Sequence, residues 1–171
     1  MEKNALSYSF AAYECLNLSA ETTKTDKAMK SKLKEFFAEG DFHLKEAKSL
    51  FFHHQEEQCN ATCQSCKAVK KYLDAYEYHF NEHFKPTENM HLLMRTLIRQ
   101  DPDFEKFYAP VFDVKCFAEE ALHHKDEFFL YDSEVDKLMH SIMELRTYIA
   151  EKVGFKKEFL FGATKNKFMG T

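Results

Sequence analysis

The chain has 171 residues, a formal net charge of −4, and only four glycines and three prolines. This length suits a single domain, and so few turn residues argue against a many-stranded sheet and favour long helices. Acidic and basic residues are interleaved with no basic block, which excludes nucleic acid as an expected partner, and no apolar run approaches the roughly 20 residues of a membrane span. The first ten residues, MEKNALSYSF, lack the pattern of a secretion signal, so a cytoplasmic protein is expected.

The first part of the chain predicts two helices. Apolar residues recur at helical intervals in residues 4–18, and a polar connection follows over residues 19–26. A long second helix is expected over residues 27–58. Gly40, which is followed by an aspartate, is expected to bend or break this helix near its middle.

The second part of the chain predicts a third long helix that ends before Pro86, a short helix capped by Thr87, and an interruption at Pro110. Two more helices are expected over residues 112–131 and 134–152, with Gly154 as the stop. The predicted fold is therefore an all-α helical bundle, with a four-helix core and additional short helices. It is expected to form one domain over residues 1–155, followed by a C-terminal tail over residues 156–171.

Three segments repeat a pattern that suits metal binding. In each, a histidine is followed four residues later by a glutamate or a second histidine, which in a helix places both side chains on one face. Imidazole and carboxylate groups are ligands for iron, zinc or manganese, and pairs on facing helices can enclose a two-metal centre. The pairs are His53 with Glu57, His79 with His83, and His123 with Glu127.

The segments HHQEE and HFNEH, in that order, resemble the hemerythrin-like, or HHE cation-binding, domains. The resemblance covers roughly residues 50 to 131 and implies a four-helix bundle around a non-haem di-iron centre held by these six residues. Such a protein binds dioxygen, senses oxygen or nitric oxide, or stores or supplies iron, so binding or sensing is expected rather than catalysis. The first helix lacks the family's early histidine, and His124 is an alternative to His123 as the third histidine ligand.

A carboxylate-rich site of the ferritin-like type is a second interpretation. Glu14 in the first helix could replace the missing histidine. Two Glu-x-x-His matches, Glu88 with His91 and Glu120 with His123, also fit this type. The function would then be that of a di-metal oxidoreductase.

Cys59, Cys63 and Cys66 form a C-x3-C-x2-C segment. With Cys116 or Cys15 as a fourth ligand, these thiolates could bind zinc or an iron-sulfur cluster. They could also pack as small buried residues, or act as a redox sensor through disulfide formation. If the histidines are surface residues, the competing function class is a helical interaction protein with a protein partner, or a maturation chaperone for a redox enzyme.

Overall fold

The structure is a computed structural model, and it describes the backbone of residues 5–53 and 57–155 and the side chains of residues 26–52 and 57–155. Five α-helices and one 3-10 helix occur in this part, and it contains no strand. The helices are α1 (Ala5–His53), α2 (Gln58–Phe80), α3 (Met90–Gln100), η2 (Pro102–Phe107), α4 (Tyr108–His123) and α5 (Asp132–Lys152). The predicted all-α helical bundle is confirmed.

The chain divides into two units, Met1–Glu35 and Phe36–Thr171. The first consists, where described, of the first part of α1. The second holds the rest of α1 and all the other helices. The predicted tail over residues 156–171 lies outside the described residues.

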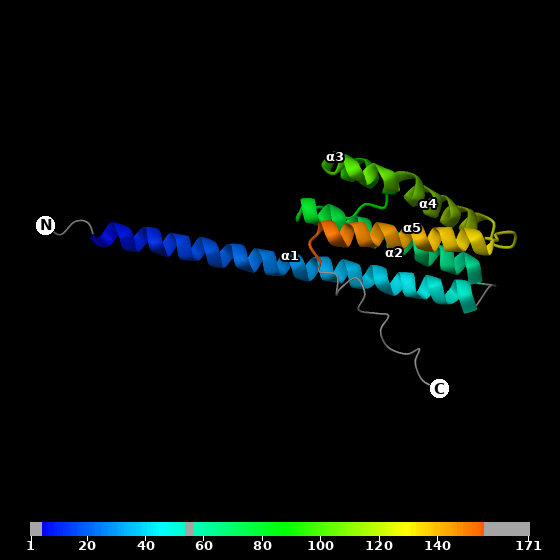
Figure 1. The fold of residues 1–171 in the computed structure, drawn as a ribbon, viewed down its shortest axis with the longest axis horizontal. Coiled ribbons are helices and arrows are strands. Elements are labelled where there is room, and N and C mark those ends of the chain that lie inside the picture. The colour runs from blue at the N-terminus through cyan, green and yellow to red at the C-terminus, as the bar shows by residue number, and fades with distance from the viewer. Residues whose placement is uncertain (1–4, 54–56, 156–171) are drawn as a thin grey trace, which may run out of the picture. The chain divides into compact units, whose positions relative to one another are not determined.

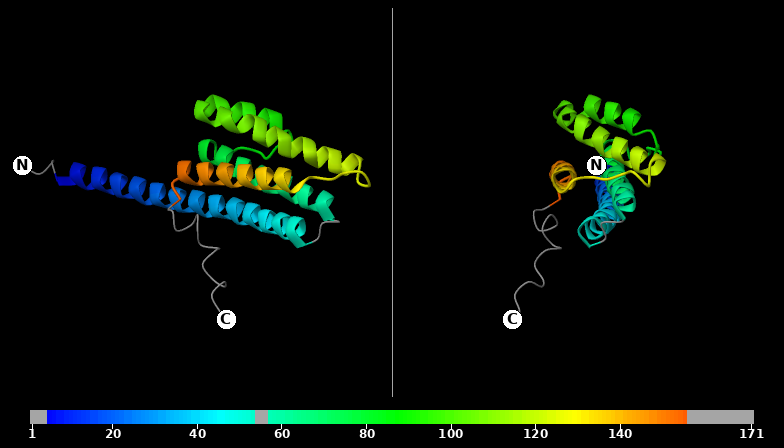
Figure 2. Two further views of the ribbon diagram at one scale, coloured as in Figure 1. Left: turned by 45° about the vertical axis from the view of Figure 1, so that its right-hand side comes forward. Right: turned by 90° about the vertical axis from the view of Figure 1, so that its right-hand side faces the viewer.

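Helix α2 is the centre of the larger unit, because it packs against α3, α4 and α5. Figures 1 and 2 show α2, α4 and α5 side by side; α2 and α5 run in the same direction, and α4 runs in the opposite direction. Alanine or serine at Ala61, Ser65, Ala68 and Ala75, all buried, lets neighbouring helices approach α2 closely. The largest fully buried side chains of this unit come from α1, α2, α3, η2 and α5, and include Phe37, Tyr72, Tyr76, Met94, Phe104 and Ile149.

Gly40 does not break α1, in contrast to the prediction from the sequence. It is buried against the ring of Tyr72 on α2, and a Cβ atom at this position would lie 2.5 Å from Tyr72 Cε1. The absence of a side chain therefore serves the close approach of two helices, and not a bend.

Several helix ends also differ from the prediction. Helix α1 runs without interruption from Ala5 to His53, through the predicted connection over residues 19–26. Helix α3 is capped by Asn89, whose side chain accepts a hydrogen bond from Leu92 N, and not by Thr87. Helix α4 begins at Tyr108, so Pro110 lies in its first turn, where no backbone N–H is needed for the helix. Helix α4 ends at His123. Gly154 ends α5 as predicted, with φ of 78°.

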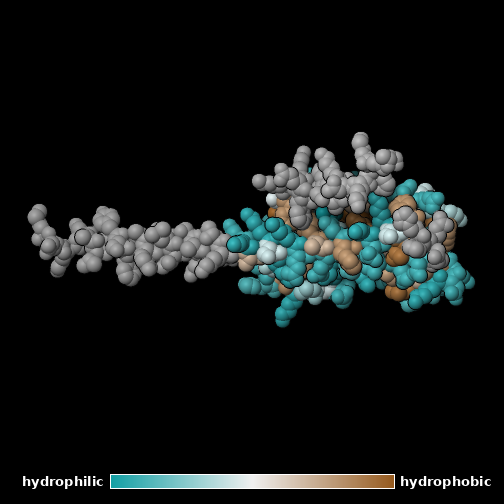
Figure 3. Space-filling view, turned by 90° about the horizontal axis from the view of Figure 1, so that it is seen from below, coloured by the Kyte–Doolittle hydropathy of each residue, from teal (hydrophilic) through white to brown (hydrophobic). Residues whose placement is uncertain are grey.

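Seen from below, the surface is mainly hydrophilic, and hydrophobic residues form separate patches on it (Figure 3). The described helices include none that is both long and apolar enough to span a membrane.

The side chain of Gln58 holds the loop between α4 and α5 against α2 at Leu130. The amide of buried Gln58 donates to Leu130 O over 3.2 Å and accepts from Leu130 N over 2.7 Å. Both Leu130 groups are thus satisfied by a single residue, and Leu130 is only 3% exposed.

We expect Gln58→Ala to lower the free energy of unfolding by about 2 kcal/mol, because it leaves a buried N–H and a buried C=O without partners. Urea unfolding would measure this loss. Gln64→Ala is the matched control on the same helix: Gln64 is half-buried, bonds only His43 among the described groups, and should cost about 0.5 kcal/mol. Equal losses in the two variants would contradict this role of Gln58.

Candidate functional site

Each of the three predicted metal-ligand pairs spans the end of a helix. Helix α1 ends at His53, α2 ends at Phe80, and α4 ends at His123. In His79 with His83 and in His123 with Glu127, the second member therefore lies beyond the helix that carries the first, and these two pairs do not share a helical face as the spacing predicted. Residues 54–56, between His53 and Glu57, lie outside the described residues. The side chain of His53 lies outside the described residues, and Glu57 directly precedes α2.

His79 is half-buried in the last turn of α2, and its ring lies nearly parallel to that of Tyr76, at 6.4 Å between centroids. Its Nδ1 atom is buried without a hydrogen-bond partner among the described residues, and burial lowers the pKa of the imidazole. The chain becomes extended at Asn81, and His83 is exposed beyond it. His79 therefore packs as a neutral aromatic residue.

His123 and Glu127 are both exposed. After α4 ends, His124 forms the cap, with its N–H bonded to Glu120 O over 2.8 Å. Glu127 lies in the turn that follows, where its N–H bonds His124 O over 3.0 Å. His123 and His124, the two alternatives for the third histidine ligand, therefore both lie at the end of α4.

Helix α2 also separates the predicted ligands from one another. Glu57 precedes its first residue and His79 lies in its last turn, so about 20 residues of helix hold them roughly 30 Å apart. These two side chains cannot bind the same metal ion. Among the described side chains, no three imidazole, thiol or carboxylate groups form a cluster that could hold a metal. Metal binding by this chain stays a prediction from the sequence.

The described residues of the ferritin-like interpretation do not form a cluster of three or more possible metal ligands. Glu14 lies outside the described side chains, and Glu88 and Glu120 are exposed. His91 Nδ1 forms a hydrogen bond of 2.9 Å with the hydroxyl group of Tyr108, which joins α3 to α4. His91 therefore has a structural hydrogen-bond partner at Nδ1.

The three clustered cysteines lie along one side of α2 as reduced, half-buried thiols, and Cys116 on α4 is also reduced. Cys59 Sγ donates to Lys125 O at 3.6 Å, and Cys66 Sγ lies 3.9 Å from Met90 Sδ. Burial, with a smaller contribution from Cys63, raises the pKa of both the Cys59 and Cys66 thiols. Thiolates are therefore disfavoured at neutral pH, which weakens both metal binding and redox reactivity.

The spacing of the cysteines along α2 also matters. Seven residues of helix separate Cys59 from Cys66 by about 10 Å, too far for all three thiols to hold one ion while α2 is intact. The side chain of Cys15, one of the two fourth ligands considered, lies outside the described residues. The described geometry favours the packing interpretation of this segment.

No family model, no curated protein and no solved structure matches this chain. The described residues themselves must therefore indicate the candidate site.

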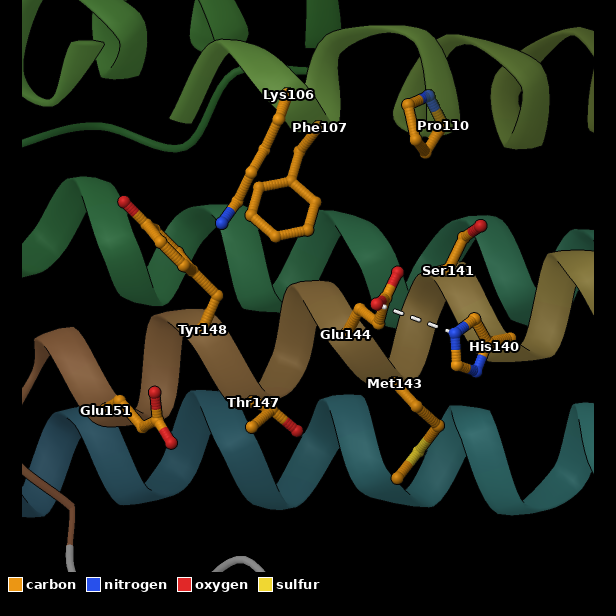
Figure 4. A pocket seen from close by; sticks show the side chains of 10 residues that line it. All are labelled: Lys106, Phe107, Pro110, His140, Ser141, Met143, Glu144, Thr147, Tyr148 and Glu151. Carbon is orange, nitrogen blue, oxygen red and sulfur yellow. Dashed lines mark ion pairs between the residues drawn. The ribbon is translucent and has the colours of Figure 1, made fainter. Parts of the chain in front are cut away.

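A groove of about 560 Å³ lies between η2 and the start of α4 on one side and α5 on the other (Figure 4). Its walls combine apolar side chains, exposed carboxylates and a lysine. The lining residues are Lys106, Phe107 and Pro110 on the first side and His140, Ser141, Met143, Glu144, Thr147, Tyr148 and Glu151 on α5. The sequence gives no sign of this groove, because its two walls are about 30 residues apart along the chain and neither wall carries a motif.

Aromatic and cationic groups meet at one end of the groove. Lys106 Nζ lies 4.4 Å from the centroid of the Tyr148 ring and 5.1 Å from that of Phe107. Figure 4 shows Lys106 and Phe107 reaching from η2 toward Tyr148 of α5. Lys152 Nζ lies 5.1 Å from the Tyr148 ring centroid. These cation–π contacts fix the position of the ring that forms this wall.

The hydroxyl group of Tyr148 is held by a buried carboxylate behind the groove. It donates to Asp101 Oδ2 over 2.6 Å; Tyr76 donates to the same oxygen, and Lys152 Nζ lies 3.2 Å from it. Burial alone would raise the pKa of Asp101, but the hydrogen bonds from Tyr148, Tyr76 and Lys152 outweigh it and lower the pKa to about 2. Asp101 is thus an ionised anchor for the aromatic wall.

This anchor predicts acid sensitivity. Because the pKa of Asp101 is lower in the folded chain, the ionised carboxylate stabilises the fold at pH values above the ordinary pKa of 3.8. This stabilisation, about 2 kcal/mol at most, is lost as the pH falls toward 2. In urea unfolding at several pH values, Asp101→Asn should be less stable than the natural chain at neutral pH, and the difference should shrink between about pH 4 and pH 2. A difference that does not change with pH would contradict the role of the ionised carboxylate.

Proposed function

We propose that this protein is a helical interaction protein that binds a polypeptide segment bearing basic and aromatic side chains in the groove between η2–α4 and α5. The observation that carries the proposal is the groove itself, whose volume of about 560 Å³ falls in the range of ligand-binding clefts. This is the second function class that the sequence suggested, now attached to a described surface.

The apolar part of the groove suits an aromatic or aliphatic side chain. Phe107 is buried at its base, Tyr148 forms the wall next to Lys106, and Met143 is 44% exposed at its rim. Methionine adapts to differently shaped partners, and aromatic rings supply large contact areas at low entropic cost. An apolar residue of a bound segment would cover the exposed surface of Met143.

The polar part of the groove suits basic side chains. Glu144 and Glu151 are exposed on α5, and their separation of seven residues places them on one face, about 10 Å apart. Among the described residues Glu144 pairs with His140 at 3.5 Å, and both side chains of this pair are more than half exposed. Such an exposed pair contributes little stability, so the carboxylate of Glu144 can readily turn to a cation of a ligand.

The test uses a labelled synthetic peptide in which lysines alternate with phenylalanine and leucine, and fluorescence anisotropy with the full-length chain. We expect Glu144→Lys/Glu151→Lys to weaken binding roughly tenfold, because two attractions become repulsions. A second peptide, with glutamate in place of each lysine, should bind the natural chain more weakly than the basic peptide.

The matched control is Asp136→Lys/Glu120→Lys, which changes the net charge equally at exposed positions outside the groove. It should leave the affinity for the basic peptide within about twofold of the natural chain, allowing for weak screened long-range charge effects. If both double variants lose the same affinity, the binding is non-specific charge attraction and the groove proposal fails.

A further inference from the structure

Helix α5 ends in a motif that reverses the chain close to the groove. Phe155 N donates to Ala150 O over 2.9 Å and Gly154 N donates to Glu151 O over 3.1 Å, while Gly154 adopts φ of 78°. These two bonds form a Schellman motif, which turns the chain back after the helix. Phe155, the last described residue, therefore lies about one turn beyond Glu151, a residue of the groove wall.

The segment that follows, residues 156–171, has the composition that the groove suits. It contains four lysines (Lys156, Lys157, Lys165 and Lys167) and a single acidic residue, Glu158. Two short apolar runs lie between and after the lysines: Phe159, Leu160 and Phe161, then Phe168 and Met169. The segment thus combines basic and aromatic side chains, and the groove presents two exposed carboxylates and an aromatic wall.

The segment is also long enough to reach the groove. The groove residues on α5 extend from His140 to Glu151, which is roughly 16 Å along the helix. Sixteen residues of extended chain reach about 50 Å, enough to pass around a helix about 10 Å wide and lie along the groove. A segment tethered this closely has an effective concentration on the order of millimolar.

We propose that residues 156–171 of this chain occupy the groove and compete with the partner segment. This inference rests on the proposed function, since it assigns a regulator to the same site. Charge complementarity favours it: the segment carries a net charge of +3, from four lysines and one glutamate, and the groove is lined by the carboxylates of Glu144 and Glu151. The tail lowers the affinity of the groove for any ligand added in trans.

Methionine methyl groups provide the test, because Met143 is the one methionine that lines the groove in the described part of the chain. The full-length chain would be labelled with ¹³C at the methionine methyl groups and studied by NMR. Met90 and Met94, which are 5% and 2% exposed, serve as internal controls for the fold. The test variant is Phe159→Ser/Phe161→Ser, and Thr164→Ser is its matched control.

We expect the Met143 methyl signal to shift in Phe159→Ser/Phe161→Ser but not in Thr164→Ser, while the Met90 and Met94 signals stay in place. A synthetic peptide of residues 156–171, added to the double variant, should move the Met143 signal back. The double variant should also bind the basic aromatic peptide at least about fivefold more tightly than the natural chain, because the tethered competitor is lost.

Two other outcomes overturn the inference, and they separate it from the proposed function. If the Met143 signal is unchanged by the tail substitutions but shifts when the basic aromatic peptide is added, the groove binds polypeptide segments and residues 156–171 do not occupy it. If the Met143 signal responds to neither, both the inference and the proposed function fail.

Discussion

Gly40→Ala is expected to lower the free energy of unfolding by about 3 kcal/mol, although alanine is normally the better helix former. The new Cβ would lie 2.5 Å from Cε1 and 2.9 Å from Cδ1 of Tyr72. The ring cannot move aside easily, because Tyr72 is fully buried, packs against Phe37 at 5.7 Å between centroids, and donates its hydroxyl hydrogen to Asp41 over 2.8 Å. Urea or thermal unfolding would measure the loss.

The control for Gly40→Ala is the same substitution in a Tyr72→Ala background. Removing the ring removes the clash, so Gly40→Ala should then stabilise that variant by up to about 1 kcal/mol through its helix propensity. If Gly40→Ala costs the same in both backgrounds, the close approach to Tyr72 is not the reason that glycine is needed at this position.

Arg146→Ala is expected to cost about 3 kcal/mol, because it removes one partner from a buried ion pair. Arg146 Nε and Nη2 donate to the two carboxylate oxygens of Asp41 over 2.6 and 2.7 Å, which ties α5 to α1. The arginine side chain is only 7% exposed, whereas that of Asp41 is 38% exposed. Water can therefore reach the remaining carboxylate, which places the expected loss at the lower end for such pairs.

Two further variants test the geometry of this pair. Arg146→Lys keeps the charge but cannot form two parallel hydrogen bonds, so urea unfolding should show a loss of about 1 to 2 kcal/mol. In Arg146→Met/Asp41→Leu no unpaired charge is left, and the double variant should be more stable than Arg146→Ala alone. A loss below about 0.5 kcal/mol for Arg146→Ala would show that the pair contributes no more than a surface contact.

The sequence predicted the helices better than their ends. Apolar residues at helical intervals and the scarcity of glycine and proline depend on local chemistry, so the all-α bundle could be inferred from them. The end of α2 at Phe80 could not, because the polar residues after it are equally compatible with a longer helix that ends at Pro86. Where local helix propensity does not distinguish two possible helix ends, packing against the rest of the fold determines the end.

The helix ends also bear on the predicted metal pairs. The four-residue spacing from His79 to His83 places the rings on one face only if the helix continues, and here it does not. The same holds for His123 and Glu127. The groove was missed for a different reason: Lys106 and Tyr148 are brought together only by the packing of η2 and α4 against α5, and the spacing of residues along the chain carries no sign of it.

Photo-cross-linking is the most direct test of the groove as the binding site. A basic aromatic peptide that carries a benzophenone group would be irradiated with the full-length chain, and the modified residues would be mapped by mass spectrometry. We expect adducts within residues 106–110 and 140–151, reduced in Glu144→Lys/Glu151→Lys. Adducts concentrated on α3 or on the exposed side of α4, and unchanged in that variant, would contradict the groove as the binding site.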